Sequence, residues 1–210
     1  MSTANLIRWS GLIGLLAGAL HVLAALLHPV GEDLAAVNSS NWVPAHLLYW
    51  ASVILLLFGL MGVSARQAEK AGRLGLVGFV LAFIGTAIVG VFLFSAATTM
   101  PLVAATAPDM FAQIMAPPAF ALPLFGLTFG LGFVLLGVAV MRAGVLPRWS
   151  GLLLLIGILL SMAEGSPIDR TLLHVIVTSG HVLLGLSLVW MGYALWSERR
   201  EPALTAKGAG

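Results

Sequence analysis

The chain of 210 residues is 60% hydrophobic and only 9% charged, with a formal net charge of +2. Because a soluble domain carries about 25% charged residues, this composition excludes an ordinary water-soluble globular protein and indicates a surface that faces lipid. The sequence has no cysteine, which rules out disulfides and thiolate metal ligands, and its basic residues are scattered between apolar runs, so the lipid bilayer rather than nucleic acid is the expected partner.

Six long apolar runs follow one another along the chain, at residues 6–29, 45–65, 73–97, 120–141, 146–163 and 171–196. A bilayer core of about 30 Å takes about 20 helical residues, and only the run at 146–163 is marginal in length. Backbone groups in lipid must bond internally, and the runs lack the alternation of a membrane barrel, so helices are expected. The sequence predicts an all-α, polytopic bundle of six transmembrane helices, forming one domain over residues 1–200.

Charges between the runs predict the orientation of this bundle. Basic residues lie near the start of the first run, after the second and fourth runs and after the sixth, at Arg8, Arg66, Lys70, Arg73, Arg142, Arg148, Arg199 and Arg200. The other connections carry mainly acidic residues, at Glu32, Asp33, Asp109, Glu164 and Asp169. Because basic loops remain in the cytoplasm, both termini are predicted to be cytoplasmic, and residues 201–210 are predicted to be a disordered cytoplasmic tail.

The outer connection after the third run carries a helix signal of its own. Thr106, Pro108 and Asp109 are typical of a helix start, and the segment ends before Pro117. A short helix near residues 106–116 is therefore predicted to lie at the outer membrane interface. Trp42, at the end of the first outer connection, is predicted to lie at the same interface.

Two segments of the first half of the chain carry a resemblance. They are Trp-Val-Pro-Ala-His-Leu-Leu at residues 42–48 and the charged turn Arg-Gln-Ala-Glu-Lys-Ala-Gly-Arg at residues 66–73. Both segments resemble those of uncharacterised bacterial six-helix inner-membrane proteins. The resemblance implies a location in the bacterial cytoplasmic membrane and implies no activity.

Glycine pairs four residues apart predict close helix packing. Gly14 and Gly18 form one pair in the first run, and Gly126 and Gly130 form another in the fourth. Such spacing lets two helix backbones approach closely, within one chain, in a homo-oligomer or with a partner membrane subunit. The spacing does not choose among these, so a non-catalytic accessory or assembly subunit is one hypothesis for the protein.

The five histidines are the most informative polar residues, because all lie in the outer half of the predicted bundle. Counting about 1.5 Å per residue from the inner basic residues puts His28, His46 and His181 at a similar depth on three different helices. His21 and His28 are seven residues apart, as are His174 and His181, so each pair shares one helix face.

This arrangement suggests two kinds of cofactor site. Imidazole nitrogens bind copper, zinc and iron, so His28, His46 and His181 form a candidate metal site. Two facing histidines on different helices, drawn from His21, His28, His46 and His181, could instead hold haem b through its iron. Either site would suit electron transfer or sensing.

Other hypotheses remain open at this point. No acidic or basic residue lies in the middle of an apolar run, which disfavours an ion-coupled transporter. Histidines near helix ends can also simply contact water and lipid headgroups. A small carrier or enzyme for a lipid-soluble molecule, covered by the short outer helix, is a third hypothesis.

Overall fold

The computed structural model describes residues 2–115, 120–164 and 166–197, so the predicted tail at 201–210 lies outside the described residues. All regular structure in these three segments is helical, which confirms the predicted all-α class. The helices in chain order are α1 (Thr3–Leu27), α2 (Leu34–Val37), α3 (Trp42–Thr106), α4 (Pro108–Met115), α5 (Ala121–Phe125), the π-helix η1 (Gly126–Gly130), α6 (Leu131–Ala143), α7 (Arg148–Ser161) and α8 (Arg170–Ser197).

Within the described residues, four helical stretches are long and apolar enough to cross a membrane: α1, α3, Pro123–Ala143 and α8. The apolar helix α7 is shorter, with 14 residues, and corresponds to the run that was marginal in the sequence. Large apolar side chains cover the outside of these helices, with Val91 73% and Leu26 66% exposed. An apolar exterior of this kind is what a lipid environment requires, because water would penalise it.

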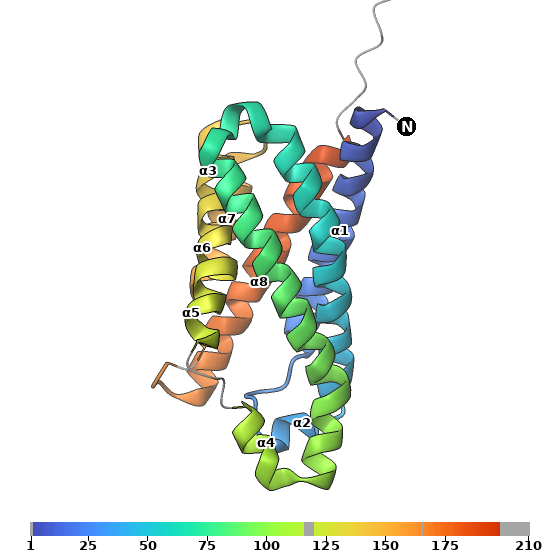
Figure 1. The fold of residues 1–210 in the computed structure, drawn as a ribbon, viewed down its shortest axis with the longest axis vertical. Coiled ribbons are helices and arrows are strands. Elements are labelled where there is room, and N and C mark those ends of the chain that lie inside the picture. Colours follow the sequence, from blue (N-terminus) through green and yellow to red (C-terminus); the bar gives the residue numbers. More distant parts are fainter. Residues whose placement is uncertain (1, 116–119, 165, 198–210) are drawn as a thin grey trace, which may run out of the picture.

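The 65-residue helix α3 contains the second and third apolar runs, and its helical geometry is interrupted between them at one glycine. Gly72 has φ 55° and ψ −147°, a backbone conformation outside the helical region that glycine adopts without a steric penalty. Figure 1 shows the chain turning back at this point, at the end of the bundle that also carries the N-terminus. The charged connection predicted at residues 66–73 is therefore helical on both sides of one glycine turn.

The long helices cross at glycines. A Cβ added to Gly18 of α1 would overlap the carbonyl oxygen of Gly185 in α8, and one on Gly14 would lie 3.4 Å from the Cα of Gly59 in α3. A Cβ on Gly130 would lie 3.1 Å from Cε of Met162. Both glycine pairs thus pack against other parts of the same chain. The Gly14 and Gly18 face, in particular, is used inside the bundle.

The end of the bundle opposite the N-terminus is covered by α2 and α4, and we call it the capped end (Figure 1). Helix α4 is the short helix predicted near residues 106–116, and its Phe111 packs in a buried cluster with Val37 and Trp42. Trp42 is 0% exposed and donates its Nε1–H to the carbonyl oxygen of Ala96 at 2.7 Å. The prediction of an interfacial Trp42 was wrong, because α2 and α4 cover this end.

Candidate metal centre

The structure sorts four of the five histidines into two pairs. His28, directly after α1, and His46, in the first turns of α3, have ring centroids 4.9 Å apart at the capped end. His181 of α8 instead pairs with His21 of α1, with Nδ1 of His181 3.1 Å from Nε2 of His21. The three histidines predicted to share one level are thus divided between the pairs, and His174 contacts Thr178 on its own helix.

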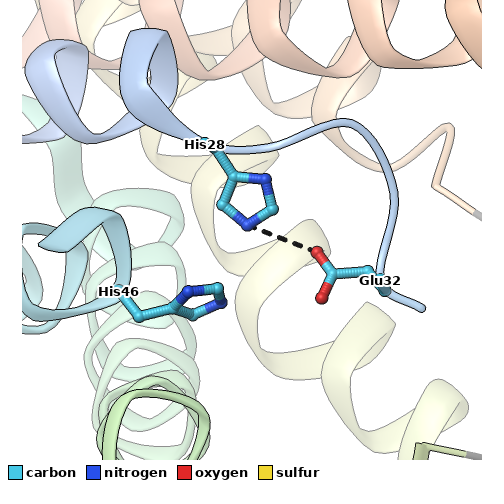
Figure 2. A group of neighbouring side chains, drawn as sticks. All are labelled: His28, Glu32 and His46. Atoms are coloured by element: carbon cyan, nitrogen blue, oxygen red, sulfur yellow. Dashed lines mark ion pairs between the residues drawn. The ribbon is translucent and has the colours of Figure 1, made fainter. Parts of the chain in front are cut away.

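A carboxylate completes the pair at the capped end. Oε1 of Glu32 lies 3.3 Å from Nε2 of His28. Ligand atoms of His28, Glu32 and His46 all lie within 4.8 Å of one another, and Figure 2 shows the three side chains converging. Sequence reasoning used Glu32 only as an outer-loop charge. The available signal was its position four residues after His28, across a Pro-Val-Gly turn.

Hydrogen bonds fix which nitrogen of each histidine is free. Nδ1 of His28 is 2.9 Å from the carbonyl oxygen of Pro29, and Nδ1 of His46 is 2.8 Å from that of Trp42. A carbonyl oxygen only accepts, so both Nδ1 atoms carry the proton and both Nε2 atoms present a lone pair. Histidines that bind metals are typically oriented by such a bond from the second nitrogen.

Glu32 lacks the partners that a buried carboxylate needs. Its Oε1 faces the Nε2 lone pair of His28, and two acceptors at 3.3 Å require a proton or a cation between them. Its Oε2 is buried and has no hydrogen-bond partner, although 32% of the side chain is exposed. Because an unpaired buried carboxylate is unfavourable, Glu32 needs a proton or a cation beside it.

The distances suit a small metal ion. Zinc binds histidine nitrogen and carboxylate oxygen at about 2.0–2.2 Å, so two ligand atoms on one ion lie about 3–4.4 Å apart. The 3.3 Å between His28 and Glu32 is already in this range, and the limit of 4.8 Å for the whole set is close to it. The spacing of the three ligand atoms is therefore close to that around a single ion.

The second pair is held by a hydrogen-bond chain of fixed direction. The hydroxyl of Ser52 donates to the carbonyl oxygen of Ala17 at 2.9 Å, so it accepts the Nδ1–H of His21 at 3.2 Å. Nε2 of His21 then accepts the Nδ1–H of His181. Tyr49 lies between the pairs, its ring centroid 4.9 Å from that of His21 and 6.0 Å from that of His28.

These contacts favour an ion over haem b. Two histidines on one iron would hold their nitrogens about 4 Å apart with a flat macrocycle between the rings. The His21 and His181 nitrogens are already hydrogen-bonded at 3.1 Å. The ring centroids of Trp42 and Tyr49 lie 5.9 Å and 6.0 Å from that of His28, so this ring already packs against aromatic side chains.

No protein-family model, curated protein or solved structure matches the chain. Function must therefore be argued from the geometry and chemistry of the site itself.

The protonation of Glu32 predicts a pH dependence for the metal-free protein. Burial raises the pKa of Glu32 from 4.5 to about 8, and the carboxylates of Glu164 and Asp33 add to the rise. Between these pH values the folded protein holds a proton that the unfolded chain has lost, so stability falls as pH rises. We expect the free energy of unfolding to fall between about pH 5 and pH 8, by at most about 1.4 kcal/mol per pH unit, and then to level off.

Thermal unfolding in detergent at a series of pH values, with metal chelated, measures this slope. Glu32→Gln removes the titrating group and should flatten the curve over the same range. Equal slopes in the two proteins would show that Glu32 is not the group responsible.

Proposed function

We propose that the protein is a multi-pass protein of the bacterial cytoplasmic membrane that binds a transition-metal ion at the outer end of its bundle. The ligands are His28, His46 and Glu32. The ion would serve metal sensing or electron transfer on the outer side of the membrane.

The proposed topology has six spans, with both termini in the cytoplasm. The spans are α1, the two halves of α3, Pro123–Ala143, α7 and α8. The N-terminus and the basic turn around Gly72 lie at the same end of the bundle (Figure 1), which supports a cytoplasmic location for that end. The capped end, with Glu32 and Asp33, would then face outward.

One observation carries the proposed metal site: three ligand atoms converge, and a single proton on Glu32 can bond to only one of the two imidazoles. The free Nε2 atoms belong to His28 and His46, and the carboxylate of Glu32 keeps a buried oxygen without a partner. A cation satisfies all three at once. Both of these histidines are held by hydrogen bonds to backbone carbonyls, so their side chains need little reorganisation to bind an ion.

The ligand chemistry limits the choice of ion. Two imidazoles and one carboxylate suit zinc, iron and copper, whereas calcium and magnesium prefer oxygen ligands alone. Three protein ligands leave at least one position for water or an exchangeable ligand, as in zinc and non-haem iron sites that are not purely structural.

Metal analysis of purified protein tests this proposal. Protein stripped with chelator in mild detergent and then exposed to zinc should retain about one ion per chain after desalting, with a dissociation constant in the micromolar range or tighter. No retained zinc, copper or iron would contradict the proposal. A strong haem absorption band in the purified protein would instead favour the haem hypothesis.

A further inference from the structure

The loop that carries Glu32 is attached to the first residue of a distant helix. Arg170 begins α8, and its Nη1 donates to Oδ2 of Asp33 at 2.8 Å. Its Nη2 donates to the carbonyl oxygen of Val30 at 2.7 Å. The two contacts lie on either side of Glu32 in the sequence, so Arg170 holds the loop on both flanks of this residue.

The loop backbone is shaped to receive the guanidinium group. Gly31 has φ 82°, a conformation that side-chain-bearing residues rarely adopt. A Cβ at Gly31 would overlap the guanidinium nitrogens of Arg170. Asp33 is itself fixed, because its Oδ1 accepts the backbone N–H of Ala36 at 2.9 Å and caps α2.

Stability of the fold does not account for this arrangement. The side chains of Arg170 and Asp33 are 55% and 48% exposed, and exposed ion pairs contribute little to folding. The two bonds instead define geometry, since a guanidinium group offers donors in a rigid planar fork and the ammonium group of lysine does not.

We infer that Arg170 is a positioning residue for the metal centre: by bonding Asp33 and Val30 it orients Glu32 toward His28 and His46. This inference rests on the proposed metal-binding function. It adds a residue of α8, 138 positions from Glu32 in the sequence, to a site whose ligands all come from the first 46 residues.

Cobalt(II) binding tests the inference, because cobalt reports both affinity and the number and kind of ligands through its visible absorption. Arg170→Gln should weaken cobalt binding about 10–100-fold, the usual effect of losing a residue that orients a ligand. Its cobalt spectrum should shift toward that of Glu32→Gln. Arg170→Lys should restore only part of the affinity, and Arg148→Gln, at the other end of the bundle, should leave it unchanged.

A double-substitution cycle separates positioning from a general structural effect. If Arg170 acts through Glu32, Arg170→Gln should weaken cobalt binding in the native background and have almost no further effect when Glu32 is already Gln. Asp33→Asn removes the same attachment from the loop side and should give the same pattern, should the first variant fold poorly.

Two results would overturn the inference while leaving the metal site intact. One is native affinity in both Arg170→Gln and Asp33→Asn. The other is an equal loss of affinity with and without Glu32. Failure of the unsubstituted protein to bind cobalt or zinc at all would instead refute the proposed function, and this inference with it.

Discussion

Replacing His46 by Ala should abolish stoichiometric zinc binding at micromolar concentrations. The substitution removes one of two imidazoles and leaves a two-ligand site. Loss of a residue that only orients a ligand already costs about 10–100-fold in affinity, so loss of the ligand itself should exceed about 100-fold. His28→Ala should have the same effect. Isothermal titration of chelator-stripped protein with zinc measures both losses.

Glu32→Gln should give a smaller but clear loss of zinc affinity. The amide oxygen of glutamine can still bind the ion, but it lacks the negative charge of the carboxylate. The informative control is His181→Ala. The sequence placed His181 among the metal ligands, whereas in the structure its Nδ1 is hydrogen-bonded to His21. We expect His181→Ala to keep native zinc affinity and to lower thermal stability. Loss of zinc binding in His181→Ala but not in Glu32→Gln would favour the ligand set predicted from the sequence.

The division of the histidines shows what a sequence can and cannot specify. Counting residues from the inner anchors gives depth, and it placed His28 and His46 at one level, where their rings lie 4.9 Å apart. Depth alone does not show which faces of two helices are in contact where the helices cross. Helices α1 and α8 meet at Gly18 and Gly185, and His21 and His181 each lie one turn from that contact. The crossing point therefore brings His181 to His21.

Glu32 could not be assigned to the site from the sequence for a related reason. Its position depends on a loop whose shape is fixed by Gly31 and by Arg170, and Arg170 lies far away in the sequence. Local patterns identify helices well, because a long apolar run has few other structures available in lipid. They identify a loop conformation poorly when the contacts that hold it come from a distant helix.

Trp42 illustrates the same limit. An aromatic residue at the end of an apolar run usually marks the membrane interface, as the exposed Trp149 (67%) is placed to do. Trp42 is buried because two short helices, α2 and α4, fold over it. The sequence predicted α4 at the outer interface but did not predict that it would pack over Trp42.

Gly18→Ala should destabilise the protein strongly, whereas Gly14→Ala on the same helix should be tolerated. The new methyl group at position 18 would overlap the carbonyl oxygen of Gly185 and lie 2.7 Å from the backbone nitrogen of Val189. Backbone atoms cannot rotate away, so α1 and α8 would have to separate. We expect a loss of at least about 1–3 kcal/mol, measured as a lower unfolding midpoint in detergent.

At position 14 the nearest atom to a new methyl group is the Cα of Gly59 at 3.4 Å, an ordinary van der Waals contact. Alanine there should be neutral or slightly stabilising, since alanine favours the helical conformation more than glycine does.

Gly185→Ala probes the α1–α8 contact from the opposite side and should match Gly18→Ala, because its methyl group would lie 2.9 Å from the carbonyl oxygen of Gly18. The crossing also holds His21 against His181, so both harmful variants should weaken that hydrogen bond while zinc affinity at His28 and His46 changes less. Equal stability of the Gly14 and Gly18 variants would show that α1 and α8 do not pack at this glycine contact, and the pairing of the two buried histidines would lose its structural basis.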